Sequence, residues 1–373
     1  MSEEKKVNRR DYLKYTGAAI GGLVVGGALG YLAKPAEVVE KTVTVPGVER
    51  TVTTTIEKTV ATTPVVKKEY EFHFISHIGP ADPNMKWLTD SMEAFMKRYP
   101  EVVVKYFAPE EFDIKKQLEL LRTSIAAKPD GLIVPITDPT ALEKDLKAAI
   151  AAGIPVVASN IPDMRKPPEK IPYLAYVGGD EYLTGYYTAK RTLELHPEIR
   201  CTVHAIPHVG HVGHEMRGKG WHDAMKEALG EKYTHHKLAI GEDPTKAMEI
   251  LTSFLEAHPE VDSAYPTAGW ASPWVYKVAT KLGKKLVIST VDESPVSIEG
   301  ILRGIITCTH SQGFWLQNYY PPLILYLYCK YGFIPQSDFI TGPIIIDKTN
   351  AERWKKLVMS IFGPETYEKL TLW

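Results

Sequence analysis

The sequence predicts an α/β protein made of two doubly wound parallel-sheet lobes. From Tyr70 onward, short apolar runs without polar alternation are separated by amphipathic segments with helical spacing. A strand that is apolar at every position is buried on both faces, as in a parallel sheet covered by helices on both sides. The 373 residues, 44% of them hydrophobic, suffice for two cores of ordinary size.

The first predicted lobe alternates strands and helices in order. We expect strands at 70–76, 102–106, 131–134 and 154–158, and helices at 82–99, 114–127 and 139–152. The helical spacing is clear in the second helix, where Leu118, Leu121 and Ile125 share one face. Connections of this kind are right-handed crossovers between parallel strands.

The second half repeats the alternation. We expect strands at 201–206, 237–240, 263–265 and 286–290, and helices that begin near His214, Asp243, Trp270 and Ser294. Such sheets bind ligands beyond the carboxyl ends of their strands, so two sheet edges that face each other across a cleft can enclose a small molecule.

The composition excludes several classes of protein. With 44 Lys+Arg against 45 Asp+Glu the net charge is −1, which argues against a nucleic-acid partner. Three cysteines without CxxC spacing exclude a disulfide scaffold and a thiolate zinc site. Residues 213–220 come within one residue of a phosphate-binding loop, but Gly220 replaces the Ser or Thr that would hold Mg²⁺. Catalysis has no positive signal, so we expect neither an enzyme nor a cofactor.

Residues 1–33 have the pattern of an export signal. The apolar run 17–32 would span roughly 24 Å as a helix, less than the roughly 30 Å hydrocarbon core of a membrane. The preceding stretch, Asn8-Arg-Arg-Asp-Tyr-Leu-Lys14, resembles the twin-arginine export signal. No clean cleavage site follows, which leaves open whether the segment is removed or stays as a membrane anchor.

Residues 34–67 form a repetitive Thr/Val-rich stretch. The unit V-E-K-T-V-T-V at 39–45 recurs with changes at 48–54 and 56–62. Units this short cannot enclose a core. We expect an extended stalk between membrane and lobes; a small β-hairpin is the alternative.

Three segments carry a resemblance to a known family. They are K-P-D-G-L-I-V-P at 128–135 with G-I-P-V-V at 153–157; Y-V-G-G-D-E-Y-L-T-G at 176–185, opening a helix; and R-x-x-G-W at 217–221 with S-T-V-D at 289–292 and T-C-T-H-S-Q at 307–312. Their order and spacing resemble, over residues 70–350, the ribose-binding-protein type of ABC-transporter solute receptor, a type I periplasmic binding protein.

The resemblance implies three chain crossings, which would form a hinge between the lobes. They would lie near Gly178-Gly179, Ser311-Gln312 and Thr341-Gly342. The first lobe would then comprise 68–178 and 313–340, and the second 179–312 and 341–373.

The resemblance also implies ligand contacts at Arg217, Asp292 and Gln312. Charged and amide groups suit sugar hydroxyls because they donate and accept hydrogen bonds in fixed directions. Each residue has an alternative reading from the sequence alone: a surface arginine in a first helical turn, a helix N-cap, and a hinge hydrogen bond, respectively.

Further candidate contacts follow from predicted strand ends. The loop after the first strand offers His77 and Asn84, and Asn160 stands where ribose-type proteins usually have Asp followed by Arg. Trp270 lies where Asn-Asp is common and could stack on a sugar or pack against the hinge. These departures leave the ligand's identity open and argue against ribose itself.

One histidine cluster has a second reading. His204, His208, His211 and His214 run from a strand into a loop, so their side chains need not converge on a metal ion. We expect structural or sugar-contacting histidines and no metal ligand, with His211 or His214 near the cleft.

The resemblance therefore implies an exported, membrane-tethered receptor that captures a monosaccharide or polyol and delivers it to an ABC permease. We expect a monomer. The alternatives are a nucleoside or signalling-molecule receptor, a sugar-processing enzyme and a zinc-binding receptor.

Overall fold

The computed structural model describes residues 69–80, 82–371 and 373. The predicted signal at 1–33 and the predicted stalk at 34–67 lie outside these residues. The chain divides into two units, 1–65 and 66–373, and the second contains all the described residues. No helix in this described part is both long and apolar enough to cross a membrane.

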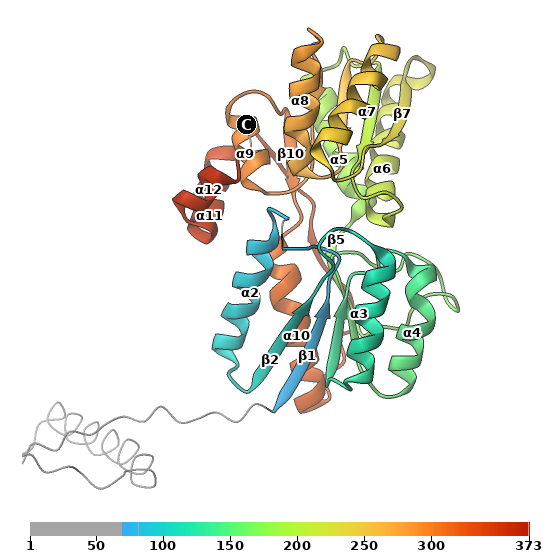
Figure 1. The fold of residues 1–373 in the computed structure, drawn as a ribbon, viewed down its shortest axis with the longest axis vertical. Coiled ribbons are helices and arrows are strands. Elements are labelled where there is room, and N and C mark those ends of the chain that lie inside the picture. Colours follow the sequence, from blue (N-terminus) through green and yellow to red (C-terminus); the bar gives the residue numbers. More distant parts are fainter. Residues whose placement is uncertain (1–68, 81, 372) are drawn as a thin grey trace, which may run out of the picture. The chain divides into compact units, whose positions relative to one another are not determined.

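The first lobe is built on a six-stranded parallel sheet in the order β11-β5-β4-β3-β1-β2 (Figure 1). Its strands are β1 (Tyr70–Ile75), β2 (Val102–Phe107), β3 (Gly131–Val134), β4 (Val156–Ser159), β5 (Tyr176–Gly179) and β11 (Phe339–Gly342). Its helices are α2 (Met85–Arg98), α3 (Ile114–Ala126), α4 (Pro139–Ala151) and α10 (Phe314–Tyr331).

The inner strands β3, β4 and β5 of the first lobe are buried on both faces, whereas the edge strands β2 and β11 are partly exposed. Ile133 belongs to the core with Leu325 of α10, whereas its neighbours Leu132 and Val134 belong to the core with Leu121 of α3. Successive side chains of a strand point to opposite faces, so α2 and α10 cover one face and α3 and α4 the other. This is why the strands have no polar alternation in the sequence.

The second lobe has a four-stranded parallel sheet in the order β7-β6-β8-β9. Its strands are β6 (Cys201–Ile206), β7 (Thr234–Ala239), β8 (Ser263–Pro266) and β9 (Val287–Ile288). Its helices are α5 (Glu181–Leu195), α6 (Val212–Leu229), α7 (Pro244–Ala257), α8 (Ser272–Lys281) and α9 (Pro295–Leu302), with short 3₁₀ turns η1 (Gly230–Lys232) and η2 (Gly269–Ala271).

Two features of the second lobe differ from the sequence-based expectation. The edge strand β7 begins at Thr234 rather than at 237, because its first residues are polar and half exposed and so lack an apolar pattern. In addition, β10 (Cys308–Ser311) pairs antiparallel with β12 (Ile344–Asp347), so the second lobe is not purely parallel.

Three chain segments connect the lobes side by side. The chain leaves the first sheet after Gly179, returns to the first lobe after Ser311, and leaves it again after Gly342. The backbone N–H of Asp180 donates to the carbonyl oxygen of Gly342 at 3.2 Å, and the hydroxyl of Thr341 donates to that of Gln312 at 2.5 Å. The first sheet continues to Gly179 and Gly342, slightly beyond the expected lobe boundaries at 178 and 340.

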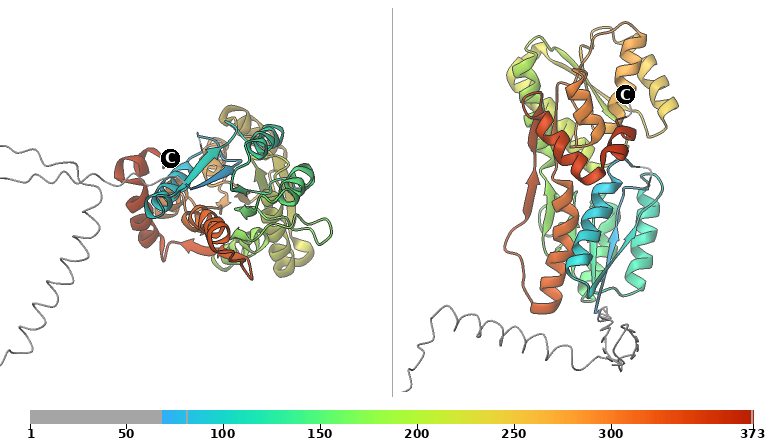
Figure 2. Two further views of the ribbon diagram at one scale, coloured as in Figure 1. Left: turned by 90° about the horizontal axis from the view of Figure 1, so that it is seen from below. Right: turned by 90° about the vertical axis from the view of Figure 1, so that its left-hand side faces the viewer.

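The C-terminal helices lie beside both lobes (Figure 2). Helix α11 (Ala351–Phe362) packs against α9 of the second lobe and α2 of the first, and α12 (Pro364–Lys369) follows it. The ring of Phe362 lies 5.2 Å from the ring of Trp87, which is buried in the core as its helical spacing suggests. The sequence assigns this C-terminal segment to the second lobe, but the segment also contacts the first lobe.

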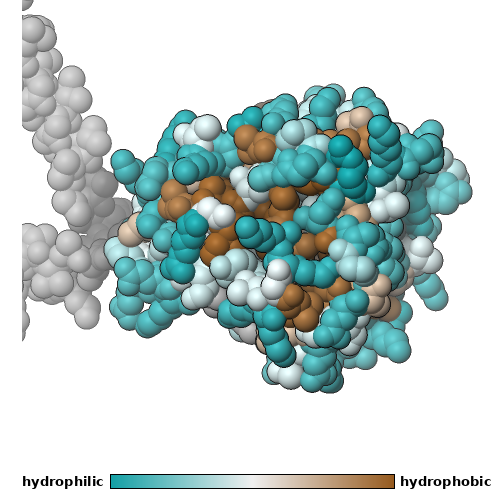
Figure 3. Space-filling model, turned by 90° about the horizontal axis from the view of Figure 1, so that it is seen from above, coloured by the Kyte–Doolittle hydropathy of each residue, from teal (hydrophilic) through white to brown (hydrophobic). Residues whose placement is uncertain are grey.

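The surface at the end formed by the second lobe is mostly polar, with hydrophobic residues gathered across its middle (Figure 3). Large contiguous apolar areas on a surface mark contact sites for other molecules, whereas single exposed apolar residues are normal. On this face the apolar residues are interspersed with polar ones.

Helices α5 and α6 approach each other closely because each presents a glycine to the other's backbone. A Cβ atom on Gly185 would lie 1.8 Å from the carbonyl oxygen of Arg217, and one on Gly220 would lie 2.0 Å from that of Tyr182. No side chain fits at either position. The close crossing brings Arg217 on α6 beside Glu181 on α5.

Gly185→Ala is expected to lower the free energy of unfolding by about 1–3 kcal/mol, because the new methyl group forces the helices apart. Denaturant unfolding measures the change. Lys190→Ala, at an exposed position of the same helix, serves as the control and should be nearly neutral. Equal stability of both variants would contradict the close crossing.

Candidate functional site

The sequence-predicted site residues all line one small pocket between the lobes. Its lining contains His77, Asn84, Asn160, Arg217, Trp270, Asp292 and Gln312. Most of them follow the carboxyl end of a strand, as expected for parallel sheets. The pocket has a volume of about 30 Å³, and a second pocket of about 420 Å³ adjoins it through shared residues that include His77, Asp82 and Trp270.

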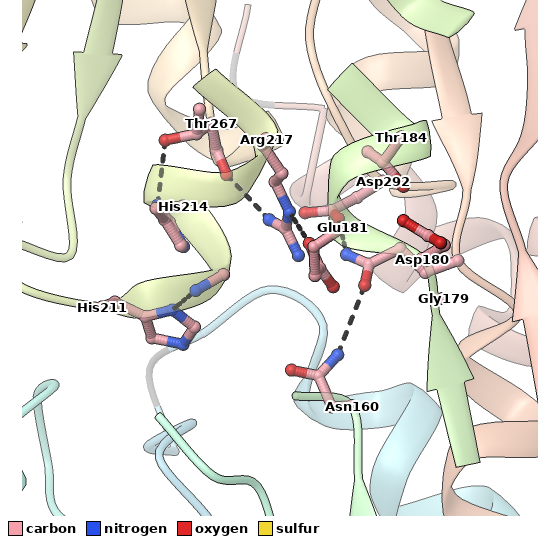
Figure 4. A network of polar contacts seen from close by, with 12 residues as sticks. Asn160, Gly179, Asp180, Glu181, Thr184, His211, His214, Arg217, Thr267 and Asp292 are labelled. Atoms are coloured by element: carbon pink, nitrogen blue, oxygen red, sulfur yellow. Dashed lines mark hydrogen bonds and ion pairs between the residues drawn. The ribbon is translucent and has the colours of Figure 1, made fainter. Parts of the chain in front are cut away.

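Asp292 is the centre of the inner pocket's hydrogen-bond network (Figure 4). Its Oδ1 accepts from Nε2 of Gln312 at 2.5 Å, and its Oδ2 accepts from Nδ2 of Asn84 at 3.4 Å and from the backbone N–H of Gly269 at 3.5 Å. Its side chain is held by a backbone with φ of +76°. Burial raises the pKa of Asp292, while the charge of Arg217 opposes that rise.

Asn160 joins the first lobe to this network. Its Nδ2 donates to Oε1 of Gln312 at 3.3 Å and to Oε1 of Gln317, on α10, at 2.8 Å. Its own φ is +62°, a left-handed conformation that Asn adopts more readily than most residues. The backbone thus turns the amide toward the hinge.

Arg217 forms a buried ion pair that the sequence does not reveal. Its Nε donates to Oε2 of Glu181, and one terminal nitrogen donates to the carbonyl oxygen of Thr267 at 2.9 Å (Figure 4). Both charged side chains are buried, with Arg217 4% exposed. Burial alone would lower the pKa of Arg217, but the attraction of Glu181 outweighs it and the pKa is raised. The arginine is therefore fixed as a cation in one orientation.

Four histidines contribute to the pocket. His208, His211 and His214 converge from the loop after β6 and the start of α6, and the ring of His77 from the first lobe lies 4.9 Å from that of His211. His204 does not join them, since its ring packs near His235 instead. Burial lowers the pKa of His208 to about 3. The sequence predicted that His211 or His214 would lie near the cleft, and both line the inner pocket.

Among the described residues, two groups have the composition and spacing to hold a metal ion. The first is His77, His208 and His211, all buried; the second is Cys201, His236 and Glu260, which is partly exposed. The sequence pointed to His208 and His211 but predicted no metal ligand. It did not bring His77 to them, or join the second group, because those residues are distant in the chain.

The outer pocket combines aromatic rings with carboxylates. Trp270 and Trp274 have ring centroids 5.1 Å apart, and Phe112 faces them from the first lobe as a further lining residue. Asp82 and Glu242 line the same space, and burial raises the pKa of Asp82 to about 7. This pocket is therefore apolar on its walls and acidic at its edge.

Sequence reasoning missed two contributors to the site. Glu181 lies within a segment that carries the family resemblance, yet only the close approach of α5 to α6 shows that it pairs with Arg217. Phe314, at the start of α10, lines the inner pocket from the far side of the hinge. In the sequence, only the position of Phe314 just after the second chain crossing could have indicated that it lies near the site.

Comparison with known proteins identifies the family. A family model described as a periplasmic binding protein domain matches residues 75–332, more than half of the chain. The chain belongs to this family of two-lobed binding proteins.

Particular relatives agree with this assignment. The xylose/arabinose-binding protein of Sulfolobus acidocaldarius is 26% identical over 250 residues, 64% of this chain, and the chain spans 60% of that relative's length.

Solved structures share the fold over most of their length. The carbohydrate transporter from Acidothermus cellulolyticus 11B in complex with myo-inositol superposes with a TM-score of 0.70 at 24% identity, over 79% of this chain and 99% of that one. The solute-binding protein of an ABC transporter from Burkholderia graminis, in complex with D-arabinose, gives 0.66 at 18% identity, over 76% and 96%. The type I periplasmic binding protein fold is confirmed.

Proposed function

We propose that this protein is a receptor that captures a monosaccharide or polyol between its lobes and delivers it to an ABC permease. The observation that carries the proposal is the inner pocket, where a buried carboxylate, a fixed guanidinium and three amides meet. Such a set can accept from and donate to several hydroxyl groups at once.

The pocket's unused hydrogen-bonding capacity supports a hydroxyl-rich ligand. Oδ1 of Asn84 has no hydrogen-bond partner within the described residues, although the side chain is buried. A buried acceptor without a hydrogen-bond partner destabilises the protein, and a hydrogen bond from a ligand hydroxyl would remove that cost. Trp270 and Phe314 offer flat apolar faces for the C–H side of a ring.

The ligands of similar proteins support the same class. The names of the relatives mention xylose and arabinose, myo-inositol, and D-arabinose. All are small polyhydroxyl compounds. These proteins are binding or transport proteins, which supports a receptor rather than an enzyme.

Contacts from both lobes give the receptor a mechanism. His77, Asn84 and Asn160 come from the first lobe, and Arg217 and Asp292 from the second. A ligand that touches both sets favours the closed arrangement by those extra contacts, and the permease would distinguish the closed form from the open one.

Titration of the full-length chain with xylose, arabinose, myo-inositol and a nucleoside control tests the proposal. A sugar at about 100 times its Kd should stabilise the protein by about 2.7 kcal/mol, seen as a rise in Tm, and should be recovered unchanged. Conversion of the sugar would indicate an enzyme. A shift with the nucleoside alone would favour a nucleoside receptor and contradict the proposal.

Export and tethering form a second part of the proposal. The basic, apolar and repetitive segments of residues 1–67 support an exported chain held at the outer face of the cytoplasmic membrane. Changing Arg9 and Arg10 together to lysine should retain the chain in the cytoplasm, measured by cell fractionation. Normal export of that variant would contradict a twin-arginine route.

A further inference from the structure

We infer that His77, His208 and His211 form a binding site for a divalent transition-metal ion such as Zn²⁺, which would link the two lobes. The three side chains each offer one ligand atom, and these atoms lie within 4.8 Å of one another. This site goes beyond the proposed receptor function, although it lies in the inner pocket and shares His77 with the proposed sugar contacts.

The three histidine rings are buried, and each has one nitrogen without a hydrogen-bond partner among the described residues. Their exposed fractions are 6%, 5% and 1% for His77, His208 and His211. Nδ1 of His77, Nδ1 of His208 and Nε2 of His211 have no hydrogen-bond partner in the part of the chain that the structure describes. Buried polar atoms of this kind call for a ligand, because their desolvation is otherwise uncompensated.

Imidazole nitrogen is a preferred ligand of zinc, and three histidines leave a fourth position for water or a substrate group. Nitrogen atoms on one tetrahedral zinc ion lie roughly 3.3 Å apart, given Zn–N bonds of about 2.0–2.1 Å. The present separations therefore require ring movements of roughly 1 Å, within the reach of side-chain rotation.

The surroundings of His208 match those of a metal-bound histidine. Its Nε2 faces Oε1 of Glu242 at 3.7 Å, while its Nδ1 is the free nitrogen. Histidines that bind a metal commonly direct their other ring nitrogen toward a carboxylate, which fixes the tautomer. Glu242 also accepts the backbone N–H of Phe112, from the opposite lobe, at 3.1 Å.

His211 must change one hydrogen bond to join the site. Its Nδ1 now accepts the backbone N–H of Gly213 at 3.1 Å, as a cap of helix α6. Ligation through Nε2 places the ring proton on Nδ1, so this bond is given up when the metal–nitrogen bond forms. Metal binding thus exchanges the helix-capping hydrogen bond of His211 for a bond between the metal and its Nε2.

The local charges permit a cation. Asp82 and Glu242 line the adjoining pocket, and the positive charge of Arg217 is paired with Glu181. Because His77 lies in the first lobe and the other two ligands in the second, the bound ion would hold the lobes together.

Equilibrium dialysis of the full-length, chelator-treated chain against Zn²⁺ tests the site, with bound zinc measured by atomic absorption. We expect one tightly held ion per chain. Loss of a group that only orients a metal-bound histidine weakens metal binding by roughly 10–100-fold, so we expect Glu242→Gln to weaken zinc binding by that amount. We expect a larger loss for each ligand variant, namely His77→Ala, His208→Ala and His211→Ala.

The second candidate group supplies the matched control. His236→Ala should leave zinc affinity unchanged, and Co²⁺ should give a spectrum without thiolate charge transfer, since Cys201 is not a ligand. Far-UV circular dichroism checks folding, and glutamine variants replace any alanine variant that fails to fold.

Several results would overturn the inference. They are no zinc retained by the wild-type chain, unchanged affinity in the folded His77 and His211 variants, and loss of zinc only in His236→Ala. A sugar titration in the presence of chelator is independent of these outcomes, so failure of the metal site and failure of the receptor function are distinguishable.

Discussion

Arg217→Ala is expected to lower the free energy of unfolding by about 3–5 kcal/mol and to abolish sugar binding. The substitution leaves the carboxylate of Glu181 buried without its cation, and an uncompensated buried charge is strongly destabilising. Denaturant unfolding without ligand and calorimetric titration with sugar measure the two effects.

The double variant Glu181→Leu, Arg217→Met separates the two effects. Replacing both partners with apolar side chains removes the unpaired charge, so stability should return toward that of the wild type while binding stays lost. If Arg217→Ala unfolds at the wild-type denaturant concentration, the buried ion pair does not exist as described.

Asp292→Asn is expected to reduce sugar affinity by at least about 100-fold. The carboxylate accepts hydrogen bonds from Gln312, Asn84 and Gly269, and an amide must turn its NH₂ group toward one of these donors. The variant also removes the charge opposite Arg217. Calorimetric titration with the sugar found for the wild type measures the loss.

Asp145→Asn is the matched control for this substitution. Asp145 forms a surface ion pair with Arg122 on the outside of the first lobe, so its loss should leave affinity unchanged. Wild-type affinity in Asp292→Asn would exclude this carboxylate as a ligand contact.

Much of the fold could be predicted because its inner strands are buried on both faces. The runs around Ile133 and Val157 are apolar at every position, and such runs indicate a covered parallel sheet. Edge strand β7 was placed less well because the solvent on one side of it permits polar residues such as His235 and His236.

The site could be predicted in part, for a similar reason. Residues that follow parallel strands meet at one sheet edge, so Asp292 and Asn160 could be proposed from their positions together with the family resemblance. Contacts between elements could not. The pairing of Glu181 with Arg217 depends on helix packing, and the meeting of His77 with His211 depends on how the lobes face each other.

The position of helix α11 has a consequence for affinity. Because it packs against α9 of one lobe and α2 of the other, separation of the lobes must disturb contacts such as that between Phe362 and Trp87. We therefore expect the unliganded protein to spend a larger fraction of its time in the binding-competent state than a chain without α11 would. Since the apparent Kd equals the intrinsic Kd divided by that fraction, we expect the last helices of the chain to strengthen the proposed sugar binding without touching the sugar.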